Sequence, residues 1–84
     1  MDGYCMFTVY ILKSLNKDRY YVGFTADLTD RLRRHNSGSN KSTKFGIPWS
    51  VVYTEEFADK KLAWLRERQI KSYKGGEAFR KLLH

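Results

Sequence analysis

The sequence predicts an α+β fold with its elements in the order β-β-α-β-α-α. Two observations lead to this prediction. Three segments are rich in β-branched and aromatic residues, as strands are. Between and after them, other segments begin with helix-capping residues and continue with apolar residues at helical spacing. A chain of 84 residues has the length of one small domain, so we expect a single domain over residues 1–84.

The N-terminal part of the chain has the pattern of a β-hairpin. Residues Phe7 to Lys13 alternate between two faces, and Arg19 to Phe24 form a second strand after a turn-forming segment. Counting back from the centre of the turn places Tyr10 opposite Tyr21, with Gly23 beside them. We therefore expect two phenols side by side on one face, next to a glycine that permits close approach of another backbone.

The middle of the chain predicts a helix, a loop and the third strand. Thr25 or Asp27 can cap a helix over about 27–36, whose acidic first turn and basic last turn suit the helix dipole. Residues 36–48 have the composition of a long surface loop. The third strand is expected from Trp49 to Glu55.

The C-terminal third predicts two more helices. Asp59 can cap a helix over 60–73 that stops at two consecutive glycines. Its expected apolar stripe consists of Leu62, Leu65, Ile70 and Tyr73. A last short helix over 77–83 is expected to pack three apolar side chains on the core, namely Phe79, Leu82 and Leu83.

Polar residues break the apolar pattern of the first predicted helix. Leu28, Arg31, Leu32 and His35 share the face that points at the sheet. Because Arg and His are costly to bury without partners, they either lie at the rim in solvent or line a polar site. Their spacing of one turn, next to a hairpin with paired tyrosines, favours a functional site.

Glu67 stands at the margin of the second helix's apolar stripe, roughly 60° beyond Ile70 at about 100° per residue. In that position its carboxylate can face a groove at the edge of the core. An ordinary helix ion pair with Lys71, four residues later, explains the same residue without any function.

Charge and composition limit the classes of partner. The chain has 16 Lys and Arg against 9 Asp and Glu, a net charge of +7, which attracts polyanions such as nucleic acid. The same charge can serve solubility alone.

The single Cys5 and the absence of a signal-like stretch lead us to expect that the protein is located in a reducing cytoplasm. No apolar run approaches the roughly 20 residues of a membrane span, so no membrane role is expected.

Five short motifs resemble those of the GIY-YIG nucleases. V-Y-I at Val9–Ile11 and Y-V-G at Tyr21–Gly23 resemble the two signature tripeptides. The resemblance continues through R-L-R-R-H at Arg31–His35, T-K-F-G-I-P-W at Thr43–Trp49 and the glutamate within R-E-R-Q-I-K at Arg66–Lys71. It covers nearly the whole chain and is greatest for the short stand-alone bacterial members, which are related to the nuclease module of the excision-repair incision subunit.

The resemblance implies a three-stranded antiparallel sheet flanked by helices and a metal-dependent DNA endonuclease of low sequence specificity, acting in repair or recombination. Its catalytic residues would be Tyr10, Tyr21, Arg31, His35 and Glu67, and Glu67 would be the ligand of one Mg²⁺ or Mn²⁺ ion. Thr8 stands where the first motif usually has glycine. Phe24 stands where some repair relatives have lysine.

Phosphodiester hydrolysis gives each of these side chains an expected role. Arg31 can contact two phosphate oxygens with its planar fork. Tyr10 is the candidate general base, and we expect the positive charges of Arg31 and the metal to lower its pKa. Tyr21 would position the water. His35 would relay protons or serve as the base in place of Tyr10, and the sequence leaves both alternatives open.

The expected partner is DNA, with branched and damaged forms as candidates and RNA as the weaker alternative; a further protein could deliver the chain to its substrate. Candidate backbone contacts are Arg33, Arg34, Lys41 and Lys44. Two other functions compete with cleavage. One is a catalytically weak or inactive nucleic-acid-binding module. The other is a protein-interaction domain that uses exposed Trp49, Trp64 and Phe45.

Overall fold

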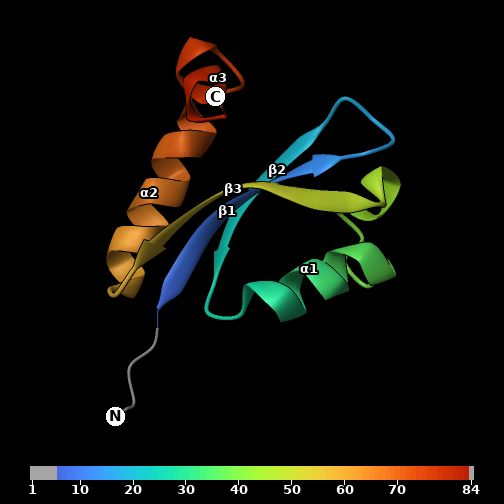
Figure 1. The fold of residues 1–84 in the computed structure, drawn as a ribbon, viewed down its shortest axis with the longest axis horizontal. Coiled ribbons are helices and arrows are strands. Elements are labelled where there is room, and N and C mark those ends of the chain that lie inside the picture. Colours follow the sequence, from blue (N-terminus) through green and yellow to red (C-terminus); the bar gives the residue numbers. More distant parts are fainter. Residues whose placement is uncertain (1–5, 84) are drawn as a thin grey trace.

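The computed structural model describes residues 6–83, which form the expected α+β arrangement. Its elements are β1 (Phe7–Ser14), β2 (Tyr20–Thr25), α1 (Leu28–Ser37), the 3-10 helix η1 (Lys44–Gly46), β3 (Trp49–Phe57), α2 (Lys60–Ser72) and α3 (Glu77–Leu82). The strands form one antiparallel sheet in the order β2-β1-β3, with α1 beside one half of it and α2 beside the other (Figure 1). The expectation for Cys5 lies outside the described residues.

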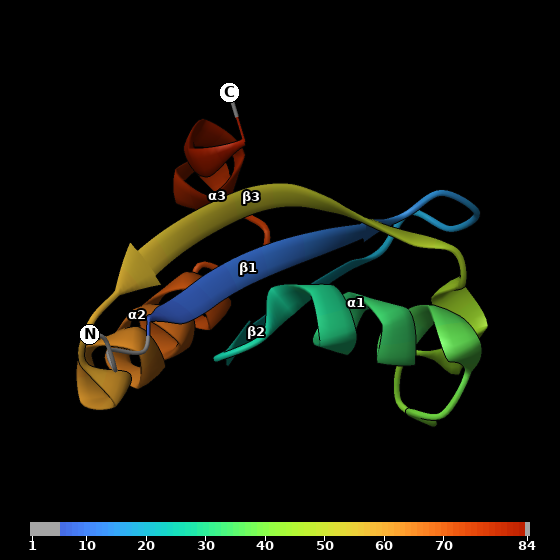
Figure 2. The same ribbon diagram turned by 60° about the horizontal axis from the view of Figure 1, so that its bottom comes forward.

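The two faces of the sheet carry separate cores, because successive residues of β1 point to opposite sides. Val9 and Ile11 face α2 and α3 and pack with Val22, Ala63, Ile70 and Phe79. Tyr10 and Leu12 face α1 and pack with Trp49 and with the half-buried Tyr21, Leu28 and Leu32. β1 therefore runs between the helices as the central strand of a curved sheet (Figure 2).

The register of the hairpin differs from the predicted one by two residues. Tyr10 pairs with Gly23, and Tyr21 pairs with Leu12. The prediction that Tyr10 lies directly opposite Tyr21 was therefore wrong. A shift of two residues leaves every side chain on its original face, since the side-chain period of a strand is two. The two tyrosines thus share one face as diagonal neighbours.

A buried serine explains the shifted register. Ser14 is 0% exposed, and its Oγ accepts hydrogen bonds from the N–H groups of Asn16 at 3.1 Å and Lys17 at 2.9 Å. Such a bond from side chain to backbone organises a turn locally. It extends β1 to Ser14 and moves the centre of the turn one residue further along the chain than predicted.

The ends of both amphipathic helices follow from their capping residues. Asp27 rather than Thr25 caps α1, and its side chain accepts a hydrogen bond from the N–H of Asp30 at 3.0 Å. Asp59 caps α2 as predicted.

None of the helices within residues 6–83 has both the length and the apolar character needed to cross a bilayer.

α2 packs on the sheet through Ile70 and Tyr73 of the predicted stripe but not through its two leucines. Ala63 and Ile70, two turns apart, are 0% exposed, whereas Leu62 and Leu65 are 53% and 46% exposed. The prediction of these two leucines as core residues was wrong. Ala63 has a small side chain, so the helix can approach the sheet closely on that face while the leucines stay in solvent. Tyr73 packs against the core as predicted.

An ion pair ties α2 to β3 next to Glu67. Arg66 Nε donates hydrogen bonds to the Glu55 carboxylate at 3.0 and 3.2 Å, and the hydroxyl of Tyr53 donates to the same group. Both charged side chains are mostly buried, so water screens their attraction less than on an open surface. Because Arg66 precedes Glu67 in the helix, this pair helps to set the rotation of the segment that carries Glu67.

The segment predicted as a surface loop is partly folded and partly buried. It contains η1, and Thr43 within it is 1% exposed. Trp49 is only 3% exposed and donates a hydrogen bond from Nε1 to the carbonyl oxygen of Thr43 at 2.8 Å. The expectation of an exposed Trp49 was therefore wrong. Phe45 and Trp64 are exposed as expected, at 51% and 41%.

Trp49 is held in place by close packing on Gly46, which yields a prediction. A Cβ added at Gly46 would lie 2.3 Å from Trp49 Cζ2, far inside contact distance. Both groups are buried, so the overlap cannot be relieved by a movement into solvent. We expect Gly46→Ala to lower the free energy of unfolding by about 1–3 kcal/mol, measured by urea denaturation.

A double-mutant cycle tests the cause of this loss. Trp49→Phe removes the outer part of the indole, so Gly46→Ala should cost less in that background than in the parent chain. If the two substitutions are strictly additive, contact with the indole is not the reason for glycine at this position.

Candidate active site

Three of the five predicted site residues meet on the α1 face of the sheet. The ring centroids of Tyr21 and His35 are 4.8 Å apart, and that of Tyr10 lies 6.3 Å from Tyr21 and 6.2 Å from His35. The Tyr10 hydroxyl is hydrogen-bonded to His35 Nε2 at 3.2 Å. Tyr10 and His35 are 0% exposed, while Tyr21 is half-buried. Tyr21 is therefore the member of this group that reaches solvent.

Gly23 leaves the space that the two phenols occupy. A Cβ at this position would lie 2.7 Å from the Tyr10 hydroxyl oxygen and 3.2 Å from Tyr21 Cε2. The sequence suggested that a glycine here permits close approach of another backbone. The group that approaches is instead the Tyr10 side chain from the paired strand.

One tautomer of His35 satisfies all the hydrogen-bond contacts around it. Thr43 Oγ1 lies 2.8 Å from His35 Nδ1 and 3.4 Å from the carbonyl oxygen of Asn40. With the proton on Nδ1, His35 donates to Thr43, Thr43 donates to Asn40, and His35 Nε2 accepts from the Tyr10 hydroxyl. Burial and the nearby Arg31 cation lower the pKa of His35, which keeps the imidazole neutral at neutral pH.

Sequence reasoning missed the role of Thr43. The residue stands at the start of the motif Thr43–Trp49, but a single threonine in a polar segment carries no chemical signal of its own. Its contact with His35 joins residues eight positions apart and depends on the folding of η1 against α1. Only the folded loop assigns it to the site.

The electrostatics of the site centre on Tyr10. The pKa of Tyr10 is raised to about 12, first by burial and then by the neighbouring Tyr21, while the charge and a hydrogen bond of Arg31 act in the opposite direction. Arg31 alone therefore does not depress this pKa as expected, because burial outweighs it. Glu67 also raises the pKa of Tyr10, so charges on α1 and on α2 both act on one hydroxyl.

Glu67 combines the two explanations that the sequence left open. Its Oε2 lies 3.1 Å from Lys71 Nζ, which is the ordinary ion pair within a helix. Its side chain is also only 14% exposed, and its charge reaches Tyr10. Glu67 is thus mostly buried and paired with Lys71, and it lies near enough for its charge to act on Tyr10.

The donor set suits a metal ion that keeps most of its water. Within residues 6–83 no three His, Cys, Asp or Glu side chains gather into a metal-binding group. Glu67 is the single carboxylate that acts on Tyr10. Carboxylate oxygens are ligands that Mg²⁺ and Mn²⁺ prefer, and Mg²⁺ commonly binds through one or two carboxylates together with substrate phosphate and water.

The four predicted phosphate-contacting residues have different surroundings. Arg34 and Lys41 line a polar cavity of about 400 Å³ together with Arg31, His35, Ser39 and Asn40. Arg34 Nε also pairs with Asp30 at 3.1 Å, as does the more exposed Arg33. Lys44 is exposed on η1 and does not line this cavity. The cavity extends from His35 outward, with cationic groups along its wall.

Comparison with known proteins identifies the family of the chain. Residues 6–78 match the family model of the GIY-YIG catalytic domain, and the chain therefore belongs to the GIY-YIG family. This family consists generally of endonucleases, which act on nucleic acid.

Several relatives are UPF0213 proteins, a name that states no activity. The chain is 39% identical to one from Staphylococcus epidermidis over 66 residues, or 77% of this chain and 79% of that protein. It is 37% identical to one from Streptococcus pyogenes serotype M3 over 67 residues, which are 79% of this chain and 72% of that protein. The chain is also similar to a UPF0213 protein from Bacillus halodurans whose solution NMR structure is known. The two sequences are 30% identical, the TM-score is 0.48, and the match covers 87% of this chain and 89% of that one.

The buried, neutral His35 predicts a pH dependence of stability. Its pKa is lowered by folding, so the unfolded chain takes up more protons once the pH falls below about 6.5. The free energy of unfolding should therefore decrease between about pH 7.5 and pH 5.5, and should decrease less in His35→Gln. Urea denaturation of both proteins at the two pH values measures this. Equal losses would mean that His35 titrates as freely in the folded chain as in the unfolded one.

Proposed function

We propose that this chain is a metal-dependent DNA endonuclease of low sequence specificity that hydrolyses phosphodiester bonds in DNA repair or recombination. One observation supports this most: the Tyr10 hydroxyl is bonded to His35, lies beside Tyr21, and is influenced by the opposite charges of Arg31 and Glu67. Arg31 and Glu67 carry opposite charges and lie close enough for both to act on the same buried hydroxyl. Membership of the GIY-YIG family adds to this support.

Arg31 and Glu67 would stabilise the reacting phosphate in different ways. Arg31 contacts two phosphate oxygens through its planar guanidinium group, a geometry that lysine cannot supply. Glu67 would hold one Mg²⁺ or Mn²⁺ ion, which when bound supplies further stabilisation of negative charge on the phosphoryl and leaving oxygens. Lys71 competes for the same carboxylate through its ion pair at 3.1 Å, which keeps Glu67 paired before substrate arrives.

The aromatic residues carry the proton taken from the attacking water. Tyr21, the most exposed of the three, positions the water, and the proton passes inward to the Tyr10–His35 pair. Because His35 Nε2 already accepts the Tyr10 proton, Tyr10 can release it there as it receives another, and no resting phenolate is needed. The water oxygen then forms a bond to phosphorus and the bond to the leaving oxygen breaks. The leaving oxygen takes up a proton from solvent, and the proton held on His35 returns to solvent through Tyr10, which restores the resting pair.

The polar cavity beside His35 provides the contacts with the DNA backbone. Arg34 and Lys41 line it and contact phosphates on either side of the cut, with Arg33 and Lys44 as additional exposed cations. Phosphate contacts position a strand without distinguishing its bases, which accounts for low sequence specificity. Branched or damaged DNA and a protein that delivers the chain to it belong to this proposal.

Nicking of supercoiled plasmid in Mg²⁺ or Mn²⁺ tests the activity. We expect Glu67→Gln and Tyr10→Phe each to lower the rate at least about tenfold, because one removes the carboxylate charge and the other breaks the bond to His35. Glu77→Gln is the matched control, since Glu77 is an exposed carboxylate on α3 and should leave the rate unchanged. If both site variants cut like the parent, the nicking comes from a contaminating nuclease.

A non-catalytic binding module is the second candidate, and the complete burial of Tyr10 favours it. Such a module binds nucleic acid with a steep loss of affinity as salt rises but cleaves nothing in either metal. A protein-interaction domain would have no affinity for nucleic acid at physiological salt. Cleavage and binding assays over a salt series therefore separate all three functions.

A further inference from the structure

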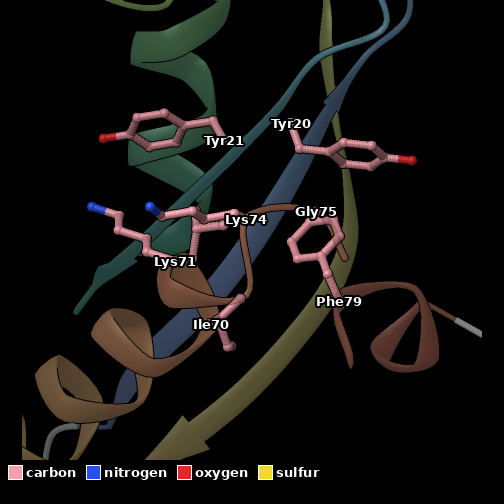
Figure 3. A pocket seen from close by; sticks show the side chains of 8 residues that line it. Tyr20, Tyr21, Ile70, Lys71, Lys74, Gly75 and Phe79 are labelled. Atoms are coloured by element: carbon pink, nitrogen blue, oxygen red, sulfur yellow. The ribbon is translucent and has the colours of Figure 1, made fainter. Parts of the chain in front are cut away.

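A second cavity, of about 310 Å³, opens beside Tyr21 on the α2 side of the sheet (Figure 3). Its lining is mainly apolar and aromatic, with two lysines. The residues are Tyr20, Tyr21, Val22, Ile70, Lys71, Lys74, Gly75 and Phe79. Apart from Tyr21 and Lys71, the ion-pair partner of Glu67, none of them is a residue to which the proposed hydrolysis assigns a role.

The wall of this cavity contains an exposed aromatic ring in a fixed position. Tyr20 is 41% exposed and contacts the buried Phe79 edge-on, with ring centroids 5.2 Å apart and an interplanar angle of 75°. Tyr20 and Tyr21 are consecutive in β2 and point in opposite directions (Figure 3). The cavity therefore offers a flat apolar surface whose orientation is set by the core.

The cationic side of the cavity adjoins the proposed active site. The amino groups of Lys71 and Lys74 point to the same side as the hydroxyl of Tyr21 (Figure 3). Lys71 is also the ion-pair partner of Glu67, at 3.1 Å. The cavity thus shares Tyr21 with the aromatic cluster and lies one helical turn from the proposed metal ligand.

We propose that this cavity binds one unpaired nucleobase from the nucleotide next to the cut phosphodiester, while Lys71 and Lys74 contact the neighbouring phosphates. Its volume is at the lower end of the range for small-ligand sites, which suits one base and excludes a duplex. Aromatic side chains with adjacent cations are the means by which proteins bind single strands. A base stacked within a duplex is not accessible to such a pocket.

This inference rests on the proposed endonuclease function and specifies its substrate as single-stranded DNA. A neighbouring cavity of about 550 Å³ shares Tyr20, Gly75 and Phe79 and carries Lys13 and Arg80 together with one acidic residue, Asp18. Tyr20 thus borders both cavities, and Lys13 Nζ, from the lining of the neighbouring cavity, lies over its ring at 5.5 Å from the centroid. An apolar side chain of a protein partner carries no negative charge to pair with the cations that border both cavities, whereas a nucleotide does.

The test measures binding in EDTA, so that it does not depend on cleavage. The probes are a single-stranded oligonucleotide containing 2-aminopurine and the same sequence as a duplex. We expect the single strand to bind at least about tenfold more tightly, with quenching of 2-aminopurine fluorescence as the base stacks. Equal affinity for the two forms, or no quenching, overturns the inference.

Matched variants assign the binding to this cavity. Tyr20→Ala should weaken single-strand binding about tenfold, and Tyr20→Phe, which keeps the ring, should not. Lys74→Ala should weaken single-strand binding. It should also reduce the slope of log affinity against log salt concentration by the contribution of about one phosphate contact. Lys60→Ala is the control for charge, because Lys60 is exposed at the start of α2 and lines neither cavity. Circular dichroism establishes that each variant is folded, and the Lys74 variant tests the inference even if Tyr20→Ala fails to fold.

The outcomes for the two proposals are separable. Cleavage that requires Glu67 but is unaffected by Tyr20→Ala and Lys74→Ala supports the endonuclease and overturns the base-binding cavity. Single-strand binding that requires Tyr20 and Lys74, in a chain that cleaves no substrate in either metal, supports the cavity and overturns the endonuclease.

Discussion

The hydrogen bond between the Tyr10 hydroxyl and His35 Nε2 is the interaction on which the candidate site depends. It joins the central strand to α1 inside the protein, where a donor or acceptor left without a partner costs about 1–3 kcal/mol. His35 therefore requires Thr43 on its other nitrogen, and Tyr10 requires the space above Gly23. The hairpin, α1 and the η1 segment are placed together by these requirements.

Tyr21 stands where the functional surfaces of the chain meet. On the α1 side it contacts His35, beside the polar cavity with its arginines and lysine. On the α2 side it borders the aromatic cavity next to Glu67 and Lys71. Consecutive residues of the edge strand β2 point to opposite faces, so Tyr20 extends the wall of the aromatic cavity while Tyr21 lies toward α1. A phosphate and its adjoining base would thus be bound by different helices around one half-buried phenol.

The sequence by itself determined the elements, their order and the chemical types at the site. Asp27 and Asp59 identify the starts of two helices because capping acts within one turn of the chain. Alternation along β1 and β2 places Tyr10 and Tyr21 on one face, and this result survives a register error of two residues. Arg31 and His35 could be singled out in advance because they interrupt the apolar face of their helix, whereas the roles of Tyr10, Tyr21 and Glu67 were implied by the family resemblance.

Only the tertiary structure decided the features that depend on contacts between distant segments. These are the pairing of Tyr10 with Gly23, the choice of Ala63 over the neighbouring leucines as the buried face of α2, and the burial of Trp49. The direction of the Tyr10 proton and the raised pKa of its hydroxyl belong to the same class. Hydrogen-bond direction and desolvation are properties of a surrounding that several segments create together, so no single stretch of sequence contains them.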